Sequence, residues 1–190
     1  MAVPQIEDEV VLRARRGDQA AFNGIVELYQ KPIFNYILRM VSDRELAEEM
    51  TQDVFLRVHQ NLGRFSFRSK FSTWLYCIAR NRALDGLRDQ PHRRHAAELT
   101  EETATVVDAP VEQGELIDAI WRAVEALPDD LKTCLLLRDV SGLSYTEITE
   151  VADASLATVK WRIFRAREIV AQQVRGSESF EPVEELAEAV

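Results

Sequence analysis

The clearest chemistry in this sequence is a short run of positive charge near its C-terminal end. Between residues 157 and 167 the chain carries four cations and no acid, although the formal net charge of all 190 residues is -9 at pH 7. The cations are Lys160, Arg162, Arg165 and Arg167. Ammonium and guanidinium groups bind phosphate oxygens and the acceptor edges of bases. Because the positive charge is local, we expect contact with nucleic acid to be local too.

A second segment interleaves aromatic rings with basic residues. Residues 64–94 hold eight Lys or Arg against two Asp, and "RFSFRSKFSTWLYCIARNR" within them is rich in Phe, Trp and Tyr. Rings stack on unpaired bases while cations follow the backbone, so the mixture suits single-stranded DNA. Asn81 offers a donor and an acceptor to a flipped base. Alternatively the rings fill a helical core, which we expect of about half of them, Phe71 and Tyr76 first.

Catalytic or metal-binding patterns do not stand out. The sequence shows no phosphate-binding loop and no Cys/His spacing typical of zinc, so we expect no metal, no cofactor and no enzyme. The acids of "AEEMTQD" are typical of a solvated helix face rather than a Mg²⁺ site. Cys77 and Cys134 lie in apolar surroundings and are predicted to be reduced core thiols. With no signal peptide and no apolar run of membrane-spanning length, we expect a cytoplasmic protein without membrane insertion.

Helical periodicity predicts an all-α fold. Apolar residues recur at intervals of three and four through 20–40, 46–58 and 75–87, and no strand pattern of useful length is present. Pro32 is expected to kink or split the first of these helices.

Three sequences mark expected helix starts. "SDRE" at 42–45 and "SYTE" at 144–147 match the capping box, in which a Ser side chain and a Glu side chain satisfy each other's backbone N–H groups. Ser155 is a good N-cap for the last helix, from about Leu156. Gly142 suits the end of the helix before them.

The periodicity stops between residues 89 and 114, where Pro, Gly, Thr and Glu accumulate. We therefore expect two small helical domains, residues 1–88 and 115–175, joined by a flexible linker at 89–114. A short acidic tail follows at 176–190.

The second domain has helix-turn-helix spacing: a capped short helix, the turn "ADAS" and the last helix. That helix would bury Val159, Ile163, Ala166 and Val170, and its other face fits the major groove of DNA. The exposed face would consist of Thr158, Lys160, Trp161, Arg162 and Arg165. Trp161 either contacts DNA or packs on its own domain. An ordinary helical hairpin with a solvated face also fits the pattern.

Four stretches in this order resemble bacterial extracytoplasmic-function sigma factors of the sigma-70 family. They are "ELAEEMTQDVFLRVHQNLGRF", "FSTWLYCIARNRALDGLR", "ALPDDLKTCLLLRDVSGLSYTEIT" and "TVKWRIFRARE". The resemblance covers roughly residues 9–88 and 115–174, and it implies that these are the sigma region 2 and region 4 domains.

The resemblance implies an alternative sigma factor that binds core RNA polymerase and directs promoter-specific initiation. The positions matching the polymerase-binding motif are Gln52, Asp53, Phe55 and Arg57. Those expected at the melted -10 element are Lys70, Trp74, Asn81, Arg82 and Arg88. Those expected at the duplex -35 element are Thr158, Lys160, Trp161, Phe164 and Arg165. Many members are held inactive by an anti-sigma protein, so such a partner is implied as well.

The sequence departs from the family pattern in the last helix. "ASLATVK" lacks the usual Pro or Gly, and Trp161 stands where a small residue is usual, so the sequence of the -35 element is not predicted. Overall acidity is expected to weaken DNA binding by the chain alone, because phosphate contact needs local positive charge.

Two other readings remain open. A stand-alone helix-turn-helix regulator would bind a palindromic duplex as a dimer, but it leaves the aromatic and basic segment unexplained. A helical protein-binding module would be insensitive to charge reversal of Lys160 and Arg165.

Overall fold

The structure, a computed structural model, describes residues 3–94 and 111–176. They form helices, and no strand occurs in these two ranges. The expected linker and tail lie largely at 95–110 and 177–190, outside the described residues.

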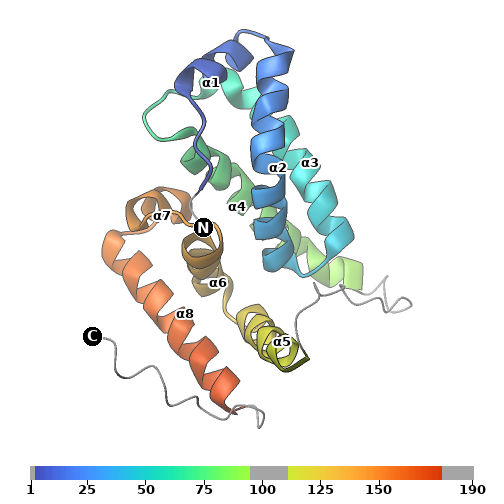
Figure 1. The fold of residues 1–190 in the computed structure, drawn as a ribbon, viewed down its shortest axis with the longest axis vertical. Helices are drawn as coiled ribbons and strands as arrows, with labels where there is room; N and C mark the ends of the chain where they lie inside the picture. Colours follow the sequence, from blue (N-terminus) through green and yellow to red (C-terminus); the bar gives the residue numbers. More distant parts are fainter. Residues whose placement is uncertain (1–2, 95–110, 177–190) are drawn as a thin grey trace.

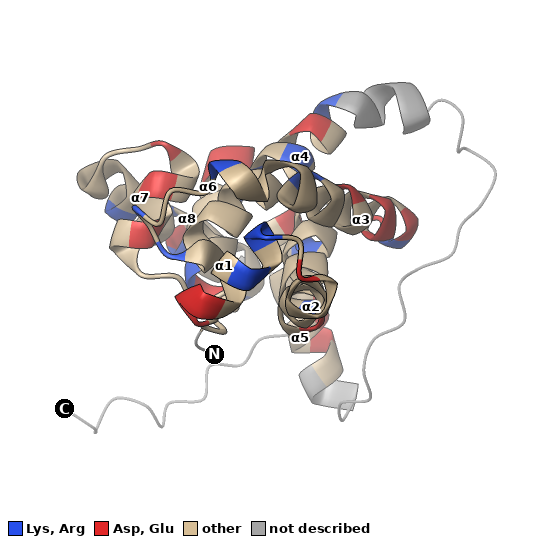
Figure 2. Ribbon diagram, turned by 90° about the horizontal axis from the view of Figure 1, so that it is seen from above, with Lys and Arg blue, Asp and Glu red and all other residues tan. Residues whose placement is uncertain are grey.

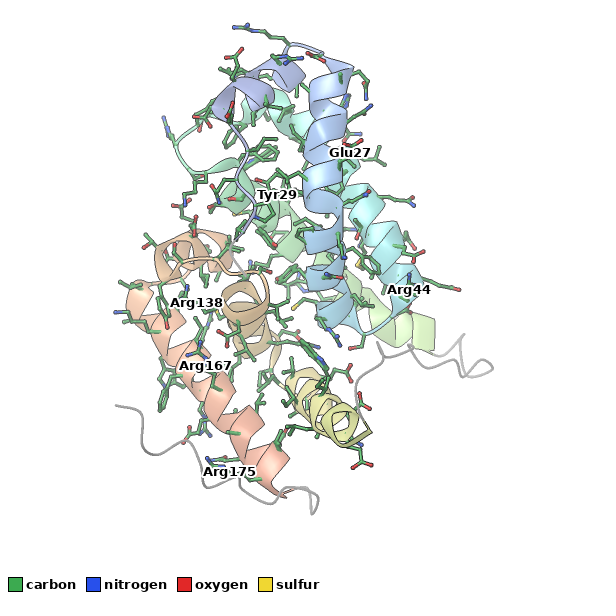
Figure 3. All side chains as sticks on the ribbon, in the orientation of Figure 1. Glu27, Tyr29, Arg44, Arg138, Arg167 and Arg175 are labelled. Atoms are coloured by element: carbon green, nitrogen blue, oxygen red, sulfur yellow. The ribbon has the colours of Figure 1, made fainter. Side chains whose placement is uncertain are left out.

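The N-terminal half consists of four α-helices that pack on one another (Figure 1). Their bounds are α1 Asp8–Arg15, α2 Gln19–Val41, α3 Arg44–Asn61 and α4 Phe71–Arg94, with a short 3-10 turn at Leu62–Arg64. Buried Tyr29 donates its hydroxyl to the carbonyl of Pro4 over 2.8 Å and so fixes the N-terminal segment on α2 (Figure 3). Burial raises the pKa of Tyr29 to about 12.

The C-terminal half consists of four further helices, of which α8 contacts the other three. Their bounds are α5 Val111–Glu125, α6 Asp129–Leu135, α7 Tyr145–Ala152 and α8 Leu156–Gly176, with a π turn at Leu136–Val140 after α6. Gly142 has φ +78°, the left-handed conformation expected of a glycine after a helix end.

Two local predictions are wrong. Ser42 does not open α3: it closes α2 in the left-handed conformation (φ 55°), and Asp43 is the N-cap, accepting from the Leu46 N–H at 2.9 Å. Only Ser42 and Asp43 connect the two helices. Because Ser42 has to reverse the chain direction after α2, Asp43 is left to cap α3. The predicted split at Pro32 does not occur: α2 is one helix, and buried residues on both sides of Pro32, such as Tyr29 and Ile33, pack into one core. That Pro32 kinks the helix stays a prediction.

The helices also extend into the expected linker. α4 continues to Arg94 and α5 begins at Val111, so the ends of the 89–114 segment are helical. Adding residues to an existing helix is favourable once the helix has nucleated, and local composition is then a weak guide to its end.

The two halves share one apolar core. α4 packs against α7, and α2 packs against α6 and the π turn, so the C-terminal half lies against the middle of the molecule (Figure 1). Tyr36 of α2 and Tyr76 of α4 meet edge to face, with ring centroids 5.7 Å apart. Burial raises the pKa of Tyr36 and of Tyr76.

Polar contacts around the end of α2 align the two halves. At the end of α2, the buried Lys132 ammonium donates to the Met40 carbonyl at 3.0 Å, and the Ser42 hydroxyl donates to Glu125 at 2.9 Å. Nearby, the Arg39 guanidinium lies 3.5 Å from the centroid of the Trp121 ring. Burial lowers the pKa of Lys132, against the opposing effects of Glu125 and Asp129.

Candidate nucleic-acid interface

The helix-turn-helix has the predicted caps. The Ser144 and Glu147 side chains form a full capping box at the start of α7. Asp153 turns the chain in the left-handed conformation (φ 48°), and the Ser155 hydroxyl accepts from the Thr158 N–H at 3.1 Å. The Thr158 hydroxyl lies 2.8 Å from that of Ser155 and is half-buried, so this predicted DNA contact also belongs to the cap.

The faces of α8 follow the prediction at most positions, but Val170, predicted to be buried, and Arg162, predicted to be exposed, are both half-buried. Val159, Ile163 and Ala166 are buried. On the other side, Trp161 is 60% exposed and Phe164 is 67% exposed. Trp161 therefore does not pack into its own domain, which resolves the alternative left open by the sequence.

Most cations of α8 have carboxylate partners. Arg162 is half-buried and pairs with Asp130 of α6 at 2.5 Å, and Arg165 pairs with Glu168 at 2.5 Å. Arg167 lies where α8 faces α6 and binds Asp139 through two nitrogens (Figure 3). Lys160 is exposed and makes no ion pair within the part of the chain that the structure describes. It is thus the cation of α8 best placed for an outside anion.

Aromatic residues before and within α4 form a cluster. Phe65 packs against Phe67, Phe71 and Trp74, with ring centroids 4.6 to 5.6 Å apart. Phe65 and Phe71 are buried and Trp74 is half-buried. The predicted core role of Phe71 and Tyr76 is confirmed. Most rings of this segment therefore pack inside the protein and are not exposed for stacking on a base.

A hollow of about 290 Å³ opens between α3 and α4. Its lining combines an aromatic face with guanidinium and amide groups, from Arg57, Asn61, Arg64, Trp74, Ile78 and Asn81. Two predicted -10 residues, Trp74 and Asn81, thus meet there. Arg64 belongs to the segment predicted to follow single-stranded DNA, Arg57 was predicted at the polymerase surface, and Asn61 was not predicted at any site. Arg57 and Asn61 lie four residues apart on α3, and this spacing could have indicated that they share one face of the helix. The Asn61 amide also donates to the Arg57 carbonyl at 2.9 Å.

The other predicted -10 residues do not line this hollow. Arg82 is half-buried and pairs with Asp53 at 2.9 Å and with Glu49 at 3.6 Å. Lys70 pairs with Glu147 of α7 at 2.9 Å. Arg88 is exposed, 3.8 Å from Asp85.

The Lys70–Glu147 pair joins the aromatic and basic segment to the helix-turn-helix. Burial raises the pKa of Glu147, but hydrogen bonds from Ser144 and Lys70 outweigh it, so the pKa lies below its usual value. One turn along, the Cys77 thiol lies 3.8 Å from the Glu150 carbonyl, and burial raises the pKa of that thiol. α7 therefore covers one side of α4.

Of the four residues predicted for polymerase binding, α3 exposes Gln52 and Arg57, half-buries Asp53 and buries Phe55. Gln52 is exposed, but Phe55 is 8% exposed and belongs to the core, because it flanks the apolar stripe of α3. Leu56 is 60% exposed and was missed. Asp53 is engaged by Arg82. Acidic residues follow α3 along its outer side (Figure 2).

An apolar groove of about 520 Å³ lies between α5, the end of α6 and α8. Its walls include Leu116, Ile120 and Trp121 of α5 and Val170 and Val174 of α8. Of these residues, only Val170 was given a place by the sequence, on the buried face of the last helix. The groove exists because α5 and α8 diverge, which no local pattern predicts.

Clusters fit for a metal ion do not occur among the described residues. In the same residues, no helix is long and apolar enough to cross a membrane. Cys134 is buried and Cys77 half-buried, both as free thiols, and burial raises the pKa of Cys134.

Comparison with known protein families assigns both halves. Residues 25–93 match the family model "Sigma-70 region 2", and residues 117–170 match "Sigma-70, region 4". The chain is 34% identical to the RNA polymerase sigma-H factor of Pseudomonas aeruginosa, over 90% of this chain and 94% of the relative.

The chain belongs to the sigma-70 family of RNA polymerase sigma factors.

Two ECF (extracytoplasmic-function) sigma factors match at similar identity, so the chain belongs to this group of the family. The chain is 34% identical to the sigma factor SigW of Bacillus subtilis, over 87% of this chain and 95% of SigW. It is 33% identical to the sigma-E factor of Escherichia coli K12, over 90% of this chain and 96% of the relative. As a sigma factor it binds core RNA polymerase and promoter DNA and directs transcription initiation.

Solved structures share the fold. CnrH, solved with the cytosolic domain of CnrY, matches with a TM-score of 0.70 at 19% identity, over 88% of this chain and 96% of that one. RpoE of Bartonella quintana, solved with the anti-sigma factor NepR, matches with a TM-score of 0.67 at 18% identity, over 82% of this chain and 98% of that one.

Proposed function

We propose that this sigma factor reads duplex -35 DNA with the exposed face of α8. The observation that carries the proposal is that Lys160, Trp161 and Phe164 project from the second helix of a fully capped helix-turn-helix. A helix of this kind enters the major groove with its first turns. Arg165 can contribute after exchanging Glu168 for a phosphate, whereas Thr158 and Arg162 already serve the fold.

We propose that the hollow between α3 and α4 receives an unpaired base of the -10 element. Trp74 offers a ring face for stacking, and the amide of Asn81 offers hydrogen bonds to a base edge. Arg57 and Arg64 bring positive charge to the same rim, where the phosphates on either side of a flipped base must pass. Arg88 is free to extend this path, since its side chain is 77% exposed.

Arg82 and Lys70 take secondary roles in this proposal. Arg82 holds α4 to α3 through Asp53 and Glu49, so its loss would disturb the hollow without removing a DNA contact. Lys70 reaches a phosphate only after it leaves Glu147.

For polymerase binding we propose Gln52 and the exposed Leu56 as the contact pair on α3, in place of Phe55. Gln52 and Leu56 lie four residues apart on one exposed face of α3, and the 60% exposed Leu56 gives that face an apolar side chain that a protein partner could bury. We propose that the first domain extends to the end of α4 at Arg94 and that the second runs from the start of α5 at Val111 to the end of α8 at Gly176.

We also propose that an anti-sigma protein restrains this chain, supported by the RpoE–NepR complex among its structural relatives. The chain has no catalytic role of its own in this proposal: it acts through polymerase, and in the cytoplasm, where polymerase and promoters are found.

Run-off transcription from a pooled genomic promoter library, with core polymerase and with or without this chain, tests the proposal. We expect new transcripts with defined starts. Lys160→Glu and Asn81→Ala should abolish most of them, while the matched surface changes Lys31→Glu and Gln30→Ala on α2 should not. New starts that survive Lys160→Glu and Asn81→Ala would contradict the residue assignments. A duplex footprint without polymerase would instead indicate a stand-alone regulator.

A further inference from the structure

The outermost strip of α8 is apolar. At 100° per residue, the buried residues Val159, Ile163 and Ala166 define the core side of the helix. Over the first turns of α8 the opposite direction falls on Ala157, Trp161 and Phe164, all exposed, and these three residues form the strip. One turn later the same line reaches Glu168, whose carboxylate pairs with Arg165. A methyl group, an indole and a phenyl ring therefore stand where the helix projects farthest from the molecule.

Positive charge lies beside this strip rather than on it. Lys160 lies on one flank and Arg165 on the other. When a helix enters the major groove, its centre meets base edges and its flanks face the two phosphate backbones. The charges of α8 are thus placed for phosphates, and the apolar strip is left for the bases.

Apolar side chains have one partner on base edges in the major groove. Guanine, adenine and cytosine present acceptors and donors there, which Arg, Asn, Gln or Glu read in pairs, whereas thymine adds an apolar C5-methyl group. The strip lacks a side chain able to form such a bidentate pair, and the indole N–H of Trp161 supplies a single donor. A solvated aromatic pair also gains most by covering apolar surface.

We infer that α8 recognises thymine C5-methyl groups in the -35 element, with Trp161 and Phe164 as the specificity-determining residues. The inference rests on the proposed -35 role of α8 and adds which base feature is read. It predicts that the -35 footprint contains at least one thymine whose methyl faces Trp161 or Phe164.

Deoxyuridine substitution tests the inference, because it removes the methyl group and leaves base pairing intact. The probe is the strongest promoter recovered in the run-off selection, with each -35 thymine of either strand replaced in turn, bound by full-length holoenzyme. We expect one or two positions at which affinity falls about fourfold, as for loss of one buried methyl. Deoxyuridine in the spacer serves as the control and should change nothing.

Variants connect the effect to the two side chains. In Trp161→Ala with Phe164→Ala, the affinity ratio between thymine and deoxyuridine probes should return to about one, whereas Phe164→Leu should keep most of it. Lys160→Ala should weaken all probes alike and leave the ratio unchanged. Because both rings are exposed, helicity by circular dichroism should match the unmodified protein.

The outcomes separate this inference from the proposed function. Absence of new transcripts in the selection would refute the sigma activity proposed for the chain. Two outcomes would overturn the thymine inference alone. In the first, transcripts appear but no -35 position is sensitive to deoxyuridine. In the second, a position is sensitive but stays so in the double variant. Loss of polymerase binding in the double variant would show that the strip serves a protein partner instead.

Discussion

The two surfaces that we propose contact DNA differ in how many of their side chains are already engaged by other residues of the chain. On α8, Lys160, Trp161 and Phe164 are exposed. On and beside α4, Lys70 and Arg82 hold carboxylates of other helices, and Trp74 packs in an aromatic cluster. A surface for duplex DNA needs only to project from a rigid helix. A surface for a separated strand needs a hollow that can enclose a base. The side chains that line and support such a hollow are held in place by contacts with other residues of the protein.

Loss of the Trp74 ring should give the largest effect that distinguishes the surfaces. We expect Trp74→Ala to weaken binding of a single-stranded -10 oligonucleotide to holoenzyme by about 30-fold, the usual loss for one stacked base. Binding of a duplex -35 probe should not change. Trp74→Phe keeps a ring and should stay within about threefold of the unmodified protein. Equal losses on both probes would indicate a general folding defect and break the comparison.

Loss of the Lys160 charge should have the opposite selectivity. We expect Lys160→Ala to reduce duplex -35 affinity by about tenfold at low salt and to lower the slope of log affinity against log salt by about one, as for one phosphate contact. The single-stranded probe should bind as before. A titration of both probes across salt concentrations measures this, and an unchanged slope would mean that Lys160 touches no phosphate.

Release of Lys70 should produce a smaller gain. Glu147→Gln keeps the capping box but removes the charge that holds Lys70, so single-stranded -10 affinity should rise about threefold. The pKa of Glu147 is lowered, so its charge, and with it the pair, persists down to acid pH and is lost only as pH falls through that depressed value. Lys70→Gln should not show the gain, which serves as the control.

The smallest expected effect concerns Cys77, which reports on the contact between α4 and α7. Burial raises the pKa of this thiol, so alkylation at neutral pH should be slow. In Glu147→Gln we expect the rate at Cys77 to rise about twofold, with the deeper Cys134 as an internal control. Equal acceleration at both thiols would indicate global loosening rather than a local change.

Local features of the fold could be predicted from the sequence because short-range chemistry determines them. The capping box at Ser144, the N-cap at Ser155 and the buried face of α8 depend on residues within a few positions of one another. The Ser42 cap prediction failed because two adjacent residues compete for one role, and the short connection decides between them.

Site residues that depend on packing between helices could not be predicted in the same way. Phe55 flanks the apolar stripe of α3, and how far such a flanking residue is buried depends on the neighbouring helices, whereas Leu56 lies opposite the stripe and its exposure follows from the helical period. Arg82 and Arg88 lie on one helix, but only Arg82 faces the acids of α3. The shared core of the two halves depends on contacts across a linker, for which the sequence has no local sign.

The Lys132 contact has a consequence for how the two halves adhere. Its ammonium is buried against the Met40 carbonyl, in surroundings that disfavour its charge, as the lowered pKa shows. If the halves part, the ammonium recovers its hydration, so the contact opposes separation only weakly. If they slide, the buried charge loses its acceptor while remaining dry, which is far more unfavourable. Lys132 therefore favours one alignment of the two halves and contributes little to holding them together, which the shared apolar core does instead.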